Sequence, residues 1–424
     1  MRIRSVSFYI ERLWVWIVYA LMLFPILPRG VESSLMIGLF ITSLVIWYKN
    51  REATLHNDYK SNIFLILSIS ILFFIYTVSL FYTTNINEGI KYITKVLPIV
   101  LFSLVFLFFC RKIKKKLKIN YIFGTYLFAI TIGLFFLQIY FLKELYLSKV
   151  SHWVLRQEIE QLTDVHGTYM SVWIGLGVFM LISKLSYKVM LNSFKEVFFY
   201  IVLISYFLYW QVTIGARTPF VLTLVLGILF FVVKSNLKKR VIISLSIIST
   251  ILLFALATSN SNIINRVENV FSFNQSFPKG DYSKEFKNIK SEDIRKGIYY
   301  CSWILAKESI WYGYGIGDVQ EELNSCYSES FDTNTYQLVE YNSHNQYLHV
   351  LLSAGIFGLL LFLLSLIIPL YLSLKQKNYS WFFFTLFIMG CFLTENIIDR
   401  HDGVIFFSLF NSIYHNINEK SINS

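Results

Sequence analysis

The chain has 424 residues, of which 55% are hydrophobic and 15% charged, and its formal net charge is +12. A soluble domain of this length could not bury so much apolar surface, whereas in a bilayer the lipid is the solvent. The basic residues lie in short loops between apolar runs instead of on one soluble face, which argues against nucleic-acid binding. The composition therefore predicts an all-α polytopic membrane protein surrounded by membrane lipids.

Apolar runs long enough to cross a bilayer, which takes about 20 residues, recur along the whole chain. We predict twelve spans, of which the first two and the last are short. They lie near 13–28, 33–48, 62–82, 92–110, 120–142, 167–183, 194–211, 218–233, 241–258, 345–372, 380–398 and 402–416. The chain then divides into spans one to nine (1–258), a large loop (259–343) and spans ten to twelve (344–424).

The distribution of Lys and Arg predicts the orientation of these spans. With the N-terminus inside, the inside loops and termini hold 22 of the 38 Lys and Arg residues, and the short outside loops hold eight. Cytoplasmic loops carry such an excess of positive charge, and long loops are not counted. We therefore expect both termini to be cytoplasmic and the 259–343 loop to be extracytoplasmic.

Two outside segments are longer than turns. Segment 143–166 contains His152, Trp153 and the charged run that begins at Arg156. In the large loop, 294–309 has the apolar spacing of an amphipathic helix, and a Gly-rich turn, 312–318, follows it. Cys301 and Cys326 share this loop, where a disulfide is permitted, but their spacing alone does not establish one.

Arg217 interrupts an apolar stretch within Gly215-Ala-Arg-Thr-Pro219. Gly and Pro there predict a helix break at the outer face, where backbone polar groups face a cavity or an interface. A charge at membrane depth costs about 2.5–3.5 kcal/mol on insertion scales, so it needs an explanation. Arg217 either faces an anionic substrate group or reaches toward lipid headgroups as an interfacial anchor.

His344 lies in Tyr341-Asn-Ser-His-Asn-Gln-Tyr-Leu348, where the large loop ends and the span that begins at Gln346 opens. The positive end of the helix dipole favours a neutral imidazole there, which suits a general base. In the alternative, Asn342 or Ser343 caps the helix and His344 has no chemical role. Gly355 and Gly358 in the same helix suggest close helix packing.

Two further charged features have weaker signals. Arg295 opens the amphipathic loop helix and by itself is an ordinary surface residue. Between the last two spans, Glu395 and Arg400 form either a structural ion pair or part of the lining of the same outside cavity. Several classes of site find no support: no cluster has metal-ligand spacing, no Gly-Lys-Ser/Thr indicates ATP hydrolysis, and no cofactor is predicted.

The order of these pieces resembles the bacterial O-antigen ligase family, which shares a core domain with some O-antigen polymerases. The resemblance covers topology over most of the chain, and its motifs lie within 213–403. The ending 394–403 also looks like members from Bacteroidetes-type bacteria. The motifs are Thr213-Ile-Gly-Ala-Arg-Thr218, Asp293-Ile-Arg295 with Trp303, Gly313-Tyr-Gly-Ile-Gly-Asp318, and Ser343-His-Asn-Gln-Tyr-Leu348 with Gly355-Ile-Phe-Gly358.

This resemblance implies a metal-independent glycosyltransferase with a GT-C-like fold in the bacterial inner membrane and a periplasmic active site. Its donor would be a glycan linked to undecaprenyl diphosphate, and its acceptor lipid A–core. Arg217 and Arg295 would bind the diphosphate, His344 would be the catalytic base, and direct displacement would invert the anomeric carbon. Asn345, Tyr347, Glu395 and Arg400 are possible supporting residues.

Two other functions remain open at this stage. An O-antigen or capsule polymerase would use the same donor with a second lipid-linked glycan as acceptor, and one sequence does not reveal the acceptor. A transporter or flippase of lipid-linked sugars would be non-enzymatic. The charges gather at the outer face instead of the bilayer midplane, where transporters place their binding sites, so the enzyme is favoured.

Overall fold

The computed structural model describes residues 2–49, 59–110, 117–146, 152–190, 193–235, 277–281 and 291–415. These residues form helices and no strand, apart from an isolated bridge between Gly280 and Thr333. The N-terminal helices are α1 (Arg2–Leu21), η1 (Phe24–Ile26), α2 (Arg29–Lys49), α4 (Tyr59–Ser79), α5 (Ile86–Ser103), η2 (Leu104–Phe109), α6 (Ile119–Tyr140), α7 (Leu142–Tyr146), α8 (His152–Thr163), α9 (Gly167–Met190), α10 (Phe194–Ile214) and α11 (Arg217–Lys234). The C-terminal helices are α14 (Ser291–Glu308), α15 (Val319–Ser330), α16 (Thr335–Leu338), α17 (Gln346–Lys375), α18 (Tyr379–Cys391), η5 (Ile397–Asp399) and α19 (His401–Tyr414).

The length and hydropathy of these helices make the chain an all-α, multi-pass membrane protein. Seven described helices are long and apolar enough to cross a bilayer, and two shorter apolar helices, Ile63–Ser79 and Tyr379–Cys391, accompany them. The predicted count of twelve is not confirmed by these helices, and the predicted span 241–258 lies outside the described residues. The seven are Arg29–Lys49, Ile86–Phe109, Ile119–Tyr140, Gly167–Tyr187, Phe194–Ile214, Arg217–Lys234 and Gln346–Lys375.

Two predicted spans have the wrong boundaries. The predicted span 13–28 does not continue as one helix, because α1 ends at Leu21 and the chain turns through η1, which contains Pro25. The predicted span 380–398 is too long, because its helix, α18, ends at Cys391. Beyond Cys391 the backbone is no longer helical, and its polar groups form hydrogen bonds with the start of α17. Phe392 O accepts from Gln346 N at 2.9 Å, and Ile398 N donates to Gln346 Oε1 at 3.0 Å.

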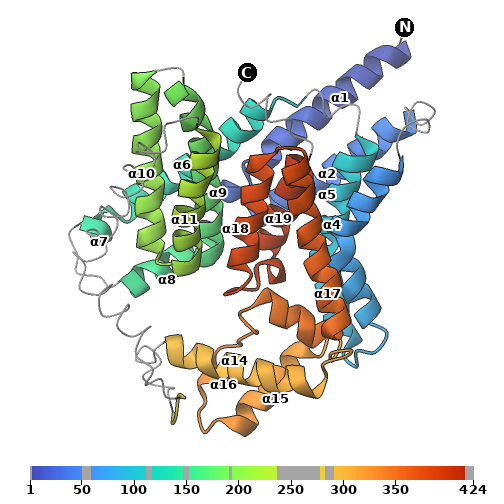
Figure 1. Cartoon of the computed structure of the whole chain (residues 1–424), viewed down its shortest axis with the longest axis vertical. Coiled ribbons are helices and arrows are strands. Elements are labelled where there is room, and N and C mark those ends of the chain that lie inside the picture. The colour runs from blue at the N-terminus through green and yellow to red at the C-terminus, as the bar shows by residue number, and fades with distance from the viewer. Residues whose placement is uncertain are drawn as a thin grey trace.

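The described helices form two hydrophobic cores of very different size. The large core joins the helices of the bundle, and the small one joins α14, α15 and α16 to the first turns of α17. Figure 1 shows α14, α15 and α16 together beyond one end of the bundle, opposite the start of α1. We call α14–α16 the cap. The predicted amphipathic helix 294–309 is therefore present as α14, and Cys301 and Cys326 form a disulfide between α14 and α15.

The cap meets the bundle where α17 is interrupted. Gly355 has φ 63° and ψ −166°, which is not helical, and an added Cβ there would meet the Trp311 carbonyl oxygen. Backbone hydrogen bonds join the two segments: Ile356 N donates to Ile310 O, and Tyr314 N donates to Leu352 O, both at 2.7 Å. The sequence suggested that Gly355 allows close packing against another helix. In the structure Gly355 instead allows the segment that leads into the Gly-rich turn to approach α17 closely.

Candidate active site

The backbone of His344 is held in an uncommon conformation just ahead of α17. Its φ is 43°, in the left-handed region that non-glycine residues rarely adopt. Asn342 Oδ1 accepts from His344 N at 3.0 Å. On the other side Asn345 is the N-cap of α17, and its side chain accepts from Tyr347 N and Leu348 N. Strain of this kind, of about 1–3 kcal/mol, persists where the surroundings fix it and is frequent at functional sites.

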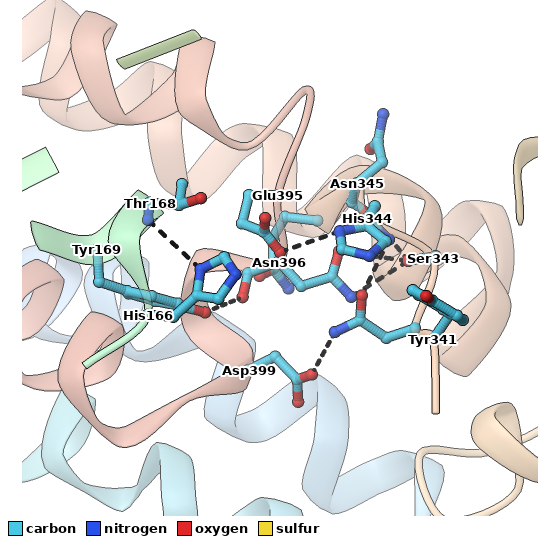
Figure 2. A network of polar contacts seen from close by, with 12 residues as sticks. His166, Thr168, Tyr169, Tyr341, Ser343, His344, Asn345, Glu395, Asn396 and Asp399 are labelled. Atoms are coloured by element: carbon cyan, nitrogen blue, oxygen red, sulfur yellow. Dashed lines mark hydrogen bonds and ion pairs between the residues drawn. The ribbon is translucent and has the colours of Figure 1, made fainter. Parts of the chain in front are cut away.

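The imidazole of His344 faces a buried carboxylate. His344 Nδ1 lies 3.2 Å from Glu395 Oε1, and their side chains are 20% and 8% exposed (Figure 2). A carboxylate on Nδ1 fixes the tautomer with Nε2 as the basic nitrogen, as in other histidine bases oriented by an acid. This arrangement gives an imidazole that can take a proton at Nε2 and keep the resulting charge beside Glu395.

Glu395 is ionised in this environment. Burial raises the pKa of its carboxyl group, but the hydrogen bond from His344 and the electrostatic influence of His344, His166 and Arg295 outweigh burial and lower the pKa to about 2. The sequence had left open an ion pair between Glu395 and Arg400. In the structure Glu395 contacts His344 instead, because residues 392–398 fold back over the start of α17. Arg400 is exposed.

The two predicted diphosphate-binding arginines lie in different surroundings. Arg295, near the start of α14, is half-buried and close enough to act on the charge of Glu395. Arg217 is the exposed first residue of α11. The predicted helix break before it is confirmed, since Gly215 ends α10 in the left-handed conformation with φ 73°. The structure thus brings Arg295 to the histidine–carboxylate pair, while Arg217 lies at the turn between α10 and α11.

A second histidine approaches Glu395 from the corner between α8 and α9. His166 influences the pKa of Glu395, and Glu395 influences that of His166, so the two groups are neighbours. Arg156 Nη2 lies 3.3 Å from His166 Nε2, and Arg156 Nε donates to Glu160 Oε1 at 2.7 Å. Burial, the largest influence, lowers the pKa of His166.

This corner also lies against the end of α10. An added Cβ on Gly167 would meet Ile214 Cγ2 at 2.9 Å and Arg156 Nε at 3.0 Å, and Gly167 N donates to Glu160 Oε1 at 2.7 Å. The Arg156–Glu160–His166 group therefore lies between the turn that carries Arg217 and the loop that carries Glu395.

Below His344, polar side chains link the loop to two helices of the bundle. Asn342 Nδ2 donates to Asp399 Oδ2 at 2.7 Å, and Asp399 Oδ1 lies 3.1 Å from Lys95 Nζ on α5. Asn396 bonds Ser343 through its side chain, and its carbonyl oxygen accepts from Tyr169 on α9 at 2.9 Å. Figure 2 shows this network around the His344–Glu395 pair.

The other predicted supporting residues have structural contacts. Asn345 caps α17 and donates from Nδ2 to Leu393 O at 3.0 Å, and Tyr347 donates to Met389 O at 2.9 Å. Both therefore join the start of α17 to the end of α18. Across the described ranges, no three His, Cys, Asp or Glu side chains are grouped as ligands for a metal ion.

Residues 199–363, from within α10 to the middle of α17, match the family model described as O-antigen ligase. This part of the chain is similar to the O-antigen ligase family. No curated protein matches the chain. The match confirms the family that the order of motifs suggested, and carries no information on the bacterial group.

The O-antigen ligase segment contains the predicted base and both predicted arginines, His344, Arg295 and Arg217. Glu395, which orients His344, lies beyond its C-terminal end, and the Arg156–Glu160–His166 group lies before its start. Sequence reasoning missed His166 entirely. Arg156 and Glu160 are spaced i,i+4 on a helical stretch, which was the available signal for an ion pair but not for its place beside Glu395.

Proposed function

We propose that the chain is a membrane glycosyltransferase that moves a glycan from undecaprenyl diphosphate to a lipid A–core acceptor at the periplasmic face. The observation that carries this proposal is the His344–Glu395 pair beside Arg295, within and next to the O-antigen ligase segment. A base oriented by a buried carboxylate next to a fixed cation suits transfer of a sugar from a diphosphate to a hydroxyl.

In the proposed reaction the acceptor hydroxyl attacks the anomeric carbon while the bond from that carbon to the diphosphate oxygen breaks. His344 Nε2 takes the hydroxyl proton, and Glu395 stabilises the imidazolium that forms. The leaving diphosphate carries the negative charge, which Arg295 and Arg217 neutralise through bidentate hydrogen bonds. Direct displacement of this kind inverts the configuration at the anomeric carbon.

The cytoplasmic placement of both termini belongs to the same proposal. The start of α1 lies at the end of the bundle opposite the cap, so a cytoplasmic N-terminus would put the cap and His344 on the outer side (Figure 1). The excess of Lys and Arg in the predicted inside loops supports this orientation. A lipid-linked donor and a lipid-anchored acceptor would then meet at the outer membrane boundary.

The test is transfer by the purified full chain in detergent, without an ion gradient. A defined undecaprenyl-diphosphate-linked oligosaccharide is incubated with lipid A–core or with a second lipid-linked oligosaccharide, and the products are separated by mass. Glycosylated lipid A–core is expected. A lengthened lipid-linked glycan would assign the polymerase activity instead, and unchanged substrates with transport in vesicles would replace the enzyme by a transporter.

A further inference from the structure

A cavity of about 500 Å³ lies apart from the His344–Glu395 pair, between η1, α6 and the start of α9. Its volume is within the range of about 300–1,000 Å³ that is usual for small-molecule pockets. The walls are largely apolar. They include Ile26, Ile130, Leu134, Leu137, Met170 and Ile174.

Two residues that line this cavity each carry a buried polar atom with no hydrogen-bond partner within the part of the chain that the structure describes. These atoms are Oε1 of Glu32 and Nε1 of Trp173. These two residues are 3% and 4% exposed. Buried polar groups are nearly always hydrogen-bonded, and an unsatisfied one is costly. One acceptor and one donor on residues that line the same cavity therefore point to a ligand with complementary polar groups.

The charged side chains at the opening of the cavity, which we call its mouth, favour one sign of charge on the polar group of that ligand. Arg29 Nη1 lies 2.7 Å from Asp164 Oδ2, and Arg29 Nη2 lies 3.1 Å from Asp402 Oδ2, so two carboxylates already occupy its guanidinium. Glu32 Oε2 lies 3.4 Å from His401 Nε2. Three carboxyl groups, those of Glu32, Asp164 and Asp402, outnumber the one guanidinium, of Arg29, and the one imidazole, of His401. An ammonium group is attracted to this mouth, whereas the head of an anionic lipid is repelled.

The apolar part of the ligand is indicated by where the cavity opens. Ile26, Phe136 and Leu162 line it and are 41%, 56% and 39% exposed, and α6 is one of the helices apolar enough to cross a bilayer. Part of the opening therefore lies on the apolar outer surface of α6, and an acyl chain can enter along that helix, beside the charged groups at the mouth. A diphosphate-linked isoprenoid would fit the walls but would bring an anion to an acidic mouth.

We propose that this cavity binds a membrane phospholipid with a primary ammonium headgroup. The ammonium donates to Glu32 Oε1, an ester or phosphate oxygen of the lipid accepts from Trp173 Nε1, and one acyl chain lies along α6. Residues 163–165 form one wall, and His166 follows them directly, so the bound lipid supports the corner that reaches Glu395.

The test uses the delipidated full chain in detergent and native mass spectrometry with phosphatidylethanolamine, phosphatidylcholine and phosphatidylglycerol of identical acyl chains. Phosphatidylethanolamine is expected to bind at least ~10-fold more tightly than the other two, because only its headgroup donates hydrogen bonds without adding net negative charge. Equal binding of the three lipids, or displacement of phosphatidylethanolamine by undecaprenyl diphosphate at equal concentration, would overturn the proposal.

Two variants localise the site. Glu32→Gln should remove the preference for phosphatidylethanolamine, and Gly133→Leu should prevent binding of any lipid there, since a Cβ at Gly133 already lies 3.0 Å from Ile26 Cγ2. Gly124→Leu is the matched control on the same helix, because nothing lies within 4 Å of its added Cβ. Unchanged binding in Glu32→Gln refutes the proposal even where Gly133→Leu fails to fold.

Discussion

Residues 199–363 and the segments that flank them contribute to the candidate site in different ways. The matched segment supplies the groups that would touch the substrates, Arg217, Arg295 and His344. The flanking segments supply the groups that hold those residues: Glu395 binds the imidazole, and Asp399 binds the side chain that fixes the His344 backbone. The motifs that identify the family thus contain the side chains proposed to carry out the reaction. The positions of those side chains depend on parts of the chain that the family model does not cover.

The largest expected effect separates the two regions directly. His344→Ala should lower kcat by about 10²–10⁴-fold, the usual contribution of a general base. Donor binding should persist, because the arginines are unchanged. Single-turnover transfer from a defined lipid-linked donor, measured with donor affinity and thermal unfolding, checks this. Near wild-type turnover in a folded variant would make His344 a bystander of the site.

Arg217→Lys should reduce turnover by about 10²-fold, although the charge is kept, because a point charge loses the paired hydrogen bonds of a guanidinium to phosphate. The measurement is kcat/KM for the donor at equal membrane levels of protein. Arg12→Lys, on an exposed position of α1, is the matched control. Equal activity of the Arg217→Lys variant and the wild type would show that Arg217 is an interfacial anchor.

Glu395→Gln should lower kcat by about 10- to 100-fold, the range seen when a carboxylate that orients a histidine is removed from metal sites. KM for the donor should change little. The exposed Glu329→Gln on α15 is the control. A loss of donor binding without a loss of kcat would contradict the orienting role.

The same variant has a consequence for acid stability. The pKa of Glu395 is lowered from 4.5 to about 2, so the carboxylate stabilises the fold above about pH 4.5, and this stabilisation is lost as the pH falls toward 2. The difference in thermal unfolding temperature between wild type and Glu395→Gln should therefore shrink over this interval. A constant difference would mean that the carboxylate is not preferentially ionised in the folded protein.

Asn342→Ala should have a smaller effect on kcat, about two- to tenfold, because one hydrogen bond contributes about 0.5–1.5 kcal/mol. It removes the acceptor of His344 N and the link to Asp399 while leaving every substrate-binding side chain in place. Asn342→Ser keeps a side-chain oxygen that can accept from His344 N and a hydroxyl that can donate to Asp399, and should recover part of the rate. Identical kcat in the two variants would show that the backbone of His344 needs no such support.

The smallest expected effect is that of chelation. Transfer should be unchanged by EDTA, because the two arginines can neutralise the leaving diphosphate. Transfer assays with and without EDTA and added Mg²⁺ or Mn²⁺ check this. Loss of activity with rescue by either metal ion would assign charge neutralisation to a metal instead.

The sequence predicted features that depend on short stretches of chain. The break before Arg217 follows from Gly215, and the amphipathic helix of the cap follows from its local apolar spacing. The disulfide and the partner of Glu395 required three-dimensional proximity, which spacing does not supply. His344 and Glu395 are 51 positions apart, and their contact exists because residues 392–398 bind the start of α17. His166 was missed for the same reason.

The interruption at Gly355 breaks the helical hydrogen bonding between the two parts of α17. Most of the buried α17 residues of the small core, Leu351 and Leu352, lie before the interruption, although Val350 there belongs to the large core; Phe362 and Leu366, after it, belong to the large core. Local unfolding follows such divisions between cooperative units. We therefore expect heating to loosen the smaller unit and displace His344 before the bundle loses its helices, so that inactivation precedes the loss of helicity.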